Sequence, residues 1–415
     1  MRLGTNESAT TDGKSRRSFL RAAIGGATLW TAGATEIIVG AAEEKQPAKK
    51  TTRFPFYHAH GSHRELGRQH GEQAAEKIAA HLDYMRHAMK LSQRDLKERA
   101  LQFRPLFKKH CPHLLDEIVG LAEGARISTA EALAVNVRGA LTTAKASVPA
   151  TGNSRRTDDG CTAFAIRAKE TADGGILIGQ NSDMLPDVVK LGYVLHLKPK
   201  DKPDVLMWSF GGMIGYHGLN QHGVANFAND LGGGPKPRFG MPHYPLKRLA
   251  LECRTLDEVL RLFRRVPLWA NGNYVLCDGT GRILDVEATT AGPEVISDNG
   301  AGYIAHANHF LSRRYATKEN HKLSVADSFA RQQRIEKLIE ERLGKTTLDD
   351  VKSYLRTRDR HTTGICRVAK TADRSASWVT AGITAASLIA APAKLKLHVA
   401  ASNDPANPFV EYAMS

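Results

Sequence analysis

The fold is indicated most clearly by "DDGCTAFAIRAKETADGGILIGQNSDM", which runs from residue 158 to residue 184. It holds two apolar segments, "CTAFAI" and "ILIG", on either side of a glycine pair that is typical of a turn. Short apolar segments that flank a turn predict two β-strands. The first strand opens on Cys161, directly after Gly160, and the second ends in "NSD". A cysteine that opens a strand in mid-chain calls for a chemical explanation.

The segment before the cysteine is "ASVPATGNSRRTDDG" (146–160), which combines turn-forming and charged residues without an apolar period. Such a segment predicts an exposed, flexible loop. A loop of this kind presents the Gly160–Cys161 peptide bond for cleavage. Glycine also has no side chain that would obstruct attack on its carbonyl carbon.

The Cys161 thiol can attack the carbonyl group that precedes it, in an N-to-S shift. Hydrolysis of the resulting thioester would leave Cys161 as a new N-terminus. A free α-amino group has a pKa near ~7.7, so it can act as general base for its own thiol at neutral pH. The alternative is an ordinary buried strand residue, since free cysteines are among the most buried residues. Residue chemistry alone leaves both interpretations open.

Composition and charge limit the classes of function. The chain has 415 residues, enough for one large domain or two to three ordinary ones, and 42% of them are hydrophobic, which supports a sizeable core. The formal net charge is +15, but we find no basic run of six residues and no nucleic-acid motif. We therefore expect no nucleic-acid partner, while an anionic or carboxylate-bearing substrate stays open.

Metal and cofactor sites are not expected. The five cysteines are scattered and form no CxxC pair, so a disulfide scaffold and a zinc site are both disfavoured. The sequence also lacks the GxSxG, HExxH, Walker A and strand-linked GxGxxG motifs. The stretches "HAHGSH" (58–63) and "HANHF" (306–310) lack the placed carboxylates of a metal site. We expect an enzyme without metal or cofactor.

The N-terminal stretch has the pattern of a targeting signal. Paired arginines in "SRRSFLR" (15–21) precede an apolar, Gly/Ala-rich segment, which predicts a twin-arginine signal peptide over residues 1–42 and a polar linker over 43–53. An uncleaved N-terminal anchor is the alternative. No later apolar run approaches 18 residues, so we expect a periplasmic or secreted protein without a stable membrane span after processing.

The remaining chain alternates between helical and strand-like segments. Apolar spacing predicts helices in 63–91, 112–127 and 128–141, where Ser128 and Glu131 form a capping box. After residue 160 short apolar runs alternate with glycine-rich turns, and "DGTG" (278–281) predicts a hairpin. Helices return in 255–266 and 324–343. This order favours a layered α+β protein over a strict βαβ repeat.

Motifs along most of the chain, from about residue 54, resemble the isopenicillin N acyltransferase-like (acyl-coenzyme A:6-aminopenicillanic acid acyltransferase) family of N-terminal-nucleophile (Ntn) cysteine hydrolases. Each motif is weak alone, but their common order is specific. The resemblance implies a four-layer αββα sandwich, in which a mainly helical α chain (54–160) and a catalytic β chain (161–415) form one domain. Besides the opening stretch, the motifs are "GSHRELGRQHGEQAAEKI" (61–78), "PHLLDEIVGLAEGARI" (112–127), "MIGYHGLNQHGVANFANDL" (213–231), "ANGNYVLCDGTGRILDVEAT" (270–289), "HANHF" (306–310) and "GICRV" (364–368).

The resemblance also implies roles for individual residues. Gly160–Cys161 becomes the self-cleaved bond and Cys161 the nucleophile. Asp183 would orient polar groups near the new amine, although strand-end turns also favour Asp. Asn273 corresponds to an asparagine that stabilises the oxyanion. The nearby Asn271 is the alternative residue for this role. Arg367 would hold a carboxylate, and Glu287 would pair with a core cation. The remaining residues would bind the substrate or have a structural role: Asn181, His306, Asn308 and His309.

The sequence departs from the family at "ANGN" (270–273), where "SSAN" is more usual, and at two single positions near these residues. Ser182 stands where an aromatic residue is usual, and Gly364 stands where serine is usual. Both changes imply a roomier or differently polar pocket, so the substrate of any one relative does not transfer to this chain.

These observations predict an exported, self-cleaving amidohydrolase. It would cleave a small amide (an acylated amine, an amino acid derivative or a lactam) through a cysteine thioester. Acyl transfer to an amine is the close alternative, and a catalytically idle binding protein or a conventional Cys–His peptidase are the others. Export favours hydrolysis, because the coenzyme A pool is cytoplasmic. The α and β chains would come from one precursor, and a homo-oligomer is compatible with the sequence.

Overall fold

The computed structural model describes residues 52–141, 160–325, 327–358, 364–371 and 382–414. They all belong to one compact unit that extends from Lys49 to Ser415. The predicted signal peptide, almost all of the linker and the loop before Gly160 lie outside the described residues. No helix in the described ranges combines the length and the apolar character needed to cross a membrane.

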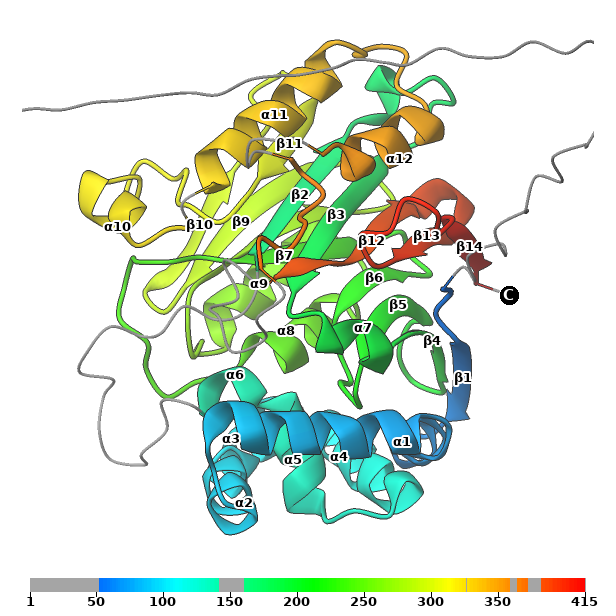
Figure 1. Cartoon of the computed structure of the whole chain (residues 1–415), viewed down its shortest axis with the longest axis vertical. Helices are drawn as coiled ribbons and strands as arrows, with labels where there is room; N and C mark the ends of the chain where they lie inside the picture. The colour runs from blue at the N-terminus through cyan, green and yellow to red at the C-terminus, as the bar shows by residue number, and fades with distance from the viewer. Residues whose placement is uncertain (1–51, 142–159, 326, 359–363, 372–381, 415) are drawn as a thin grey trace, which may run out of the picture. The chain divides into compact units, whose positions relative to one another are not determined.

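Two β-sheets form the centre of the unit (Figure 1). Strand β1 pairs with β4 in parallel, and the other pairings between described strands are antiparallel. In spatial order the first sheet contains β1 (Phe56–Gly61), β4 (Gly192–Pro199), β5 (Val205–Phe210), β6 (His217–Asn220), β7 (Ala225–Asp230), β8 (Gly272–Cys277), β9 (Ile283–Thr289) and β10 (Gly292–Ile296). The second contains β11 (Tyr303–His306), β2 (Gly160–Ile166), β3 (Leu177–Met184), β12 (Ile383–Ala391), β13 (Lys396–Ala401) and β14 (Val410–Ala413).

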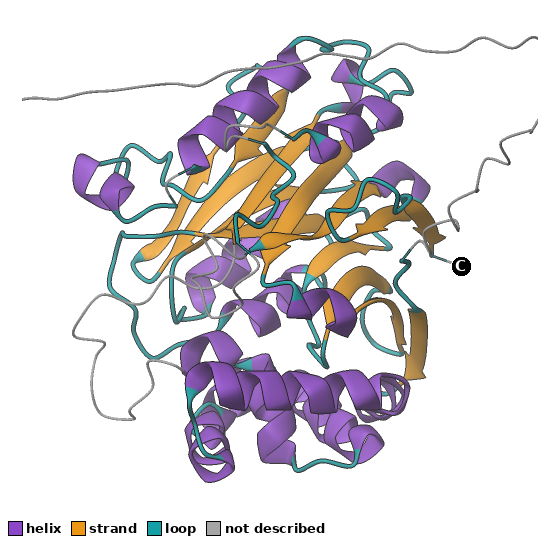
Figure 2. Cartoon of the chain, viewed as in Figure 1, coloured by secondary structure: helices purple, strands orange, loops and turns teal. Residues whose placement is uncertain are grey.

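Helices cover the outer faces of both sheets, which Figure 2 shows as purple layers around the orange strands. The helical segment before Gly160 contains α1 (His63–Met89), α2 (Gln93–Leu101), α3 (Arg104–His110), α4 (Pro112–Ala125), α5 (Thr129–Asn136) and α6 (Arg138–Leu141). The later helices are α7 (Asp187–Leu191), α8 (His243–Ala250), α9 (Leu256–Arg265), α10 (Lys318–Lys322), α11 (Ser328–Glu340) and α12 (Leu348–Arg356). This arrangement is the predicted α+β four-layer αββα sandwich.

The predicted strand pair around the glycine turn is confirmed. Strands β2 and β3 are antiparallel, with Cys161 opposite Ser182 and Gly160 opposite Asp183. All seven residues of β2 are buried, because its two faces contact different cores. Ala163 and Ala165 pack in the core between the sheets, whereas Phe164 and Ile166 pack in a second core with residues of α11 and α12. Small side chains thus face the other sheet, and large ones face the helices.

Side chains alternate between the two faces along a strand, so the same two faces can be assigned to the residues at the strand ends. We call the side of the second sheet that faces the first sheet its inner face, and the side beneath α11 and α12 its outer face. Cys161 shares the inner face with Ala163. Thr162 shares the outer face with Phe164. In β3, by the register with β2, Ser182 lies on the inner face and Asp183 on the outer face.

The long helices α1 and α4 approach each other closely because both present glycine at four-residue spacing. Gly67 and Gly71 lie on α1, and Gly120 and Gly124 lie on α4. A Cβ atom added to Gly67 would lie 1.9 Å from the carbonyl oxygen of Glu117, and one added to Gly120 would lie 2.0 Å from that of Arg64. Any larger residue would push the helices apart. The capping boxes of α1 and of the predicted helix α5 are both present.

Candidate active site

Cys161 lies at the start of β2 and is held by side chains on both sides of its backbone. The residue is 1% exposed. Its backbone N–H donates to Asn308 Oδ1 at 3.0 Å, and its carbonyl oxygen accepts a hydrogen bond from Arg331 Nη1 at 2.6 Å. The Asn308 amide therefore holds the nitrogen of the predicted scissile peptide, and the Arg331 guanidinium holds the carbonyl of the peptide that follows it.

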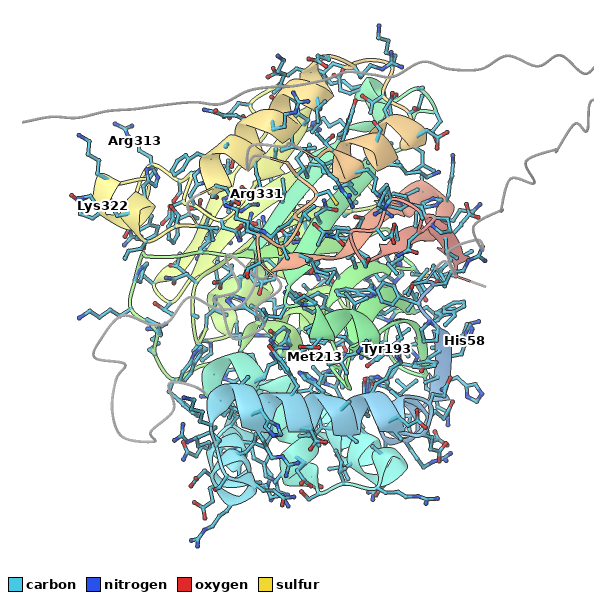
Figure 3. The ribbon with its side chains drawn as sticks, viewed as in Figure 1. His58, Tyr193, Met213, Arg313, Lys322 and Arg331 are labelled. Atoms are coloured by element: carbon cyan, nitrogen blue, oxygen red, sulfur yellow. The ribbon has the colours of Figure 1, made fainter. Side chains whose placement is uncertain are left out.

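Arg331 is fully buried and joins several groups around Cys161. Figure 3 shows it between helix α11, which carries it, and the strands of the second sheet. Its guanidinium donates to Thr162 Oγ1 at 2.7 Å and to Asn308 Oδ1 at 2.7 Å. Its Nε donates to Asp327 Oδ1 at 2.9 Å. Asn308 in turn donates from Nδ2 to the carbonyl of Asp230 at 3.0 Å, which links the site to strand β7 of the first sheet.

Asp183 connects to the same groups from the end of β3. It accepts hydrogen bonds from Thr384 Oγ1 at 2.7 Å and from Arg367 Nε at 3.2 Å. Arg367 Nη2 also donates to Asp327 at 2.8 and 3.0 Å. The groups Asp183, Arg367, Asp327, Arg331 and Asn308 thus form a continuous chain that returns to the backbone of Cys161. We call these five residues the nucleophile network.

Burial and neighbouring charges have opposite effects in this network. Burial raises the pKa of the Asp183 carboxyl, although Arg367 and Arg331 act against it. Burial also favours the neutral form of Asp327, but there Arg331 and Arg367 outweigh it and hold the carboxyl pKa below its usual range. Asp327 therefore serves as the anion that joins the two buried arginines.

The network lies on the outer face of the second sheet, whereas the Cys161 thiol lies on the inner face. The network therefore contacts the amide nitrogen and carbonyl oxygen of Cys161. Such a network can orient the Cys161 nitrogen, the group predicted to become an amine. Across the strand pair, the inner-face neighbour of the thiol is Ser182, whose hydroxyl lies 3.3 Å from Tyr216 Oη. The Ser182 departure from the family thus falls beside the thiol.

Asn181 and the neighbouring Gln180 use their side chains to anchor other parts of the chain. Asn181 Nδ2 donates to the carbonyls of Leu355 at 2.8 Å and Ile365 at 3.0 Å, so it fixes the segment that leads to Arg367. Gln180 lies on the inner face and donates to Asn229 Oδ1 at 2.7 Å on the facing sheet. The structure thus gives Asn181 two backbone contacts that hold the site together.

Asn273 belongs to a second polar group, which is buried between the sheets. Its Nδ2 donates to Asp285 Oδ1. His306 Nε2 lies 3.7 Å from Asp285 Oδ2 and 3.3 Å from Glu287 Oε1. Burial raises the pKa of Asp285 to about 7, against the opposing effect of His306. Burial favours neutral His306, but the two carboxyl groups outweigh it and raise the imidazole pKa.

The structure separates Asn273 from Asn271, two asparagines that the sequence alone leaves open to confusion. Asn271 Nδ2 donates to the carbonyls of Gly233 and Pro235, both at 2.8 Å, and its Oδ1 accepts the N–H of Thr290. Asn271 therefore anchors a loop. Asn273 faces the second sheet, and the hydrogen bond recorded for it goes to Asp285.

His309 lies at the edge of the network beside an open pocket. Its Nδ1 is 2.8 Å from Ser328 Oγ, which also accepts the backbone N–H of Asn308. Burial and nearby cations lower the pKa of His309 to about 3, so its imidazole is neutral at physiological pH. The pocket has a volume of about 310 Å³, and its lining includes His309, His321, Phe329 and Glu336.

Three residues of the site, Asp327, Arg331 and Thr384, were not predicted from the sequence. Asp327 and Arg331 are spaced i,i+4, which in a sequence is typical of an exposed ion pair on a helix. Only the docking of α11 on the second sheet buries Arg331 and brings the half-buried Asp327 to Arg367. In the described part of the chain, no group of three or more His, Cys, Asp or Glu residues is arranged to hold a metal ion.

Comparisons with known proteins agree with the resemblance seen in the sequence. A sequence model of the family described as "Acyl-coenzyme A:6-aminopenicillanic acid acyl-transferase" matches residues 169–400. A relative from Emericella nidulans, "Acyl-coenzyme A:6-aminopenicillanic-acid-acyltransferase 40 kDa form", is 26% identical over 286 residues, which cover 67% of this chain and 75% of that protein.

Two solved structures are also similar to this chain. A mutant of conjugated bile acid hydrolase from Clostridium perfringens has 13% sequence identity and a TM-score of 0.43, with 61% of this chain and 92% of that chain covered. Penicillin V acylase from Agrobacterium tumefaciens has 12% identity and a TM-score of 0.37, with 60% and 78% covered.

Proposed function

The chain belongs to the acyl-coenzyme A:6-aminopenicillanic acid acyl-transferase family, and on that premise we propose that it is a self-cleaving enzyme that breaks small amides with the Cys161 thiol. The observation that supports this proposal most strongly is the pair of hydrogen bonds to the backbone of Cys161. Its N–H and its carbonyl oxygen are both bound by side chains of one buried charged network.

Maturation would break the Gly160–Cys161 bond in two steps. The Cys161 sulfur attacks the Gly160 carbonyl carbon, its proton passes to the departing nitrogen, and a thioester replaces the peptide bond. Water then cleaves the thioester, which releases a Gly160 carboxylate and regenerates the thiol. Asn308 Oδ1 accepts a hydrogen bond from the Cys161 nitrogen, so it would hold that nitrogen in place as it becomes an amine.

The mature reaction would repeat this chemistry on a substrate. The Cys161 amine accepts the thiol proton, and the sulfur attacks the carbonyl carbon of the substrate amide. The proton then passes to the leaving amine, and water hydrolyses the acyl thioester. In the precursor the Gly160 acyl group occupies the place that the substrate acyl group would take. Arg331, close to Asn308, would disfavour protonation of the new amine and so keep it basic but neutral.

Asn273 and Asp183 would have different tasks in this scheme. Asn273 faces the side of the thiol, as a stabiliser of the tetrahedral oxyanion must, but its Nδ2 is engaged with Asp285. It would have to turn toward the substrate or act with another donor. Asp183 holds Arg367 and, through Asp327, positions Arg331.

Export by the twin-arginine route, with periplasmic or secreted location, is part of the same proposal. It rests on the paired arginines and apolar stretch in residues 15–42. An enzyme outside the cytoplasm has no coenzyme A donor, so water would be the usual acyl acceptor. The second candidate is acyl transfer to an amine, and the acyltransferase name of the Emericella nidulans relative favours it.

A substrate panel tests the proposal. Acylated amino acids, acylated amines and lactams are incubated with the processed wild-type protein and with Cys161→Ala, and the products are identified by mass spectrometry. We expect release of a free acid and an amine by the wild type alone. Formation of a new amide when a second amine is added would identify acyl transfer. Equal turnover by Cys161→Ala would exclude Cys161 as nucleophile.

A further inference from the structure

A second pocket lies away from the nucleophile, against the first sheet. It has a volume of about 760 Å³, and α3, α4, α8 and α9 all contribute to its lining. Helix α9 packs on the outer face of the first sheet, because the ring centroid of Phe263 lies 4.7 Å from that of Tyr274 on β8. The neighbouring Asn273 points the other way, toward the second sheet. The first sheet therefore separates this pocket from the Cys161 thiol.

Positive charge surrounds the pocket. Arg261, Arg264 and Arg265 from α9 line it, together with Lys202 from the β4–β5 connection. The three arginines are exposed. Within the ranges that the structure describes, none of the four side chains takes part in an ion pair. Four cations around one hollow give it a strong positive potential.

The acidic residues of the pocket offset only part of this positive charge, because Glu252 has partners of its own and Glu258 is one carboxylate beside four cations. Glu252 is bound by His113 Nε2 at 2.8 Å and by Arg248 Nε at 3.2 Å. Glu258 accepts the backbone N–H of Arg254 at 2.7 Å. The excess of positive charge is therefore available to a ligand from solution.

From this arrangement we propose that the pocket binds a small polyanion, a molecule with two or more phosphate or carboxylate groups. Arginine side chains form paired hydrogen bonds with both groups. The cations surround a hollow, which suits a compact ligand better than an extended polymer. Because His110 and His113 lie before Gly160 in the chain and the arginines lie after it, a bound polyanion would join the two segments that self-cleavage separates.

Calorimetric titration of the full-length protein with pyrophosphate tests this site. The pocket variant combines Arg261→Glu and Arg264→Glu. The matched control combines Arg313→Glu and Lys322→Glu, two exposed residues near α10 that Figure 3 labels. Both variants change the net charge equally. We expect saturable binding by wild type and control, and a loss of affinity of at least about tenfold in the pocket variant, since charge-assisted hydrogen bonds are removed.

Three results would overturn the proposal: no binding by the wild-type protein, an equal loss in the control, or unchanged affinity in the pocket variant. A milder variant, Arg264→Gln, is measured if the double variant unfolds, and it should also weaken binding. Competition by citrate would identify carboxylates as ligands. Failure of citrate to compete with bound pyrophosphate would identify phosphate groups as the required chemistry.

Discussion

Two buried charge networks in this protein are built alike but contact different groups. In the nucleophile network, Arg367 joins the carboxylates of Asp183 and Asp327. In a second network among helices α1, α4 and α8, the fully buried Arg248 joins Glu117 at 2.8 Å and Glu252 at 3.2 Å. The second network, which we call the helix-layer network, also includes His63 and His113.

The difference between them lies in what the charges hold. The nucleophile network ends on the backbone of Cys161. The helix-layer network joins helices that precede Gly160 to a helix that follows it, so its contacts are between elements of the scaffold. Buried, paired charge alone therefore does not identify a catalytic site, because structural ion pairs have the same features. Contact with Cys161, the proposed nucleophile, makes the distinction.

Removing the central arginine of each network should have the greatest effect. Arg367→Met and Arg248→Met each remove a buried cation that joins two carboxyl groups, so each should lower the free energy of unfolding by about 3–5 kcal/mol. Only Arg367→Met should abolish self-cleavage and amide hydrolysis. Denaturant unfolding and activity per folded molecule check both variants. Equal residual activity in the two variants would contradict the distinction between the networks.

Arg331 offers a test within the nucleophile network. Arg331→Met removes the donors to the Cys161 carbonyl and to Asn308, and we expect kcat to fall by about 100-fold, close to the cost of losing one preorganised donor. Because the cation near the amine is lost, the acidic limb of the pH–rate profile should also move to higher pH. Arg331→Lys should restore part of the rate and return the limb toward its original position. An unchanged limb in Arg331→Met would show that Arg331 has no influence on the base.

Asp285, which lies between the sheets, should influence stability more than rate. Its raised pKa means that the folded protein keeps a proton that the unfolded chain releases between about pH 4 and 7. The free energy of unfolding should therefore fall as pH rises through this window, by at most about 1.4 kcal/mol per pH unit for one proton. Asp285→Asn should flatten that slope. An identical slope in the variant would contradict the assignment.

In the helix-layer network, Glu117 should make the free energy of unfolding depend on pH in the opposite direction. Burial opposes ionisation of Glu117, but Arg248 and His63 outweigh it and lower its pKa. Its contribution to stability is present above the unfolded pKa and is lost as pH falls through the folded pKa. Stability curves of Asp285→Asn and wild type at several pH values separate the two effects.

Local features of the fold were predictable from the sequence. The strand pair β2–β3, the hairpin between β8 and β9, and the capping box of α5 all follow from turn residues and side-chain period. The cysteine at the strand start and the "NSD" at the neighbouring strand end pointed to the site. These signals act over short stretches of chain, so one sequence contains them completely.

Other parts of the site depend on how distant elements dock. Arg331 lies in a helix whose charged residues look solvent-exposed, and only its contact with β2 brings it to Cys161. The alternation of side chains in β8 indicates which of its residues share a face. It does not show which group Asn273 contacts, because its partner Asp285 lies on the neighbouring strand β9. The ordered family motifs are the source of the roles proposed for Asp183 and Arg367, which residue chemistry alone left open.

The mass and N-terminal sequence of the purified, folded wild-type protein test self-cleavage most directly. We predict two fragments that remain associated, the larger of which begins with Cys161. The Cys161→Ala variant should remain one chain with no internal cleavage. A folded wild-type chain that stays intact at Gly160–Cys161 and cleaves amides, or one with an unreactive Cys161 thiol, would contradict a mechanism in which Cys161 is both the new N-terminus and the nucleophile.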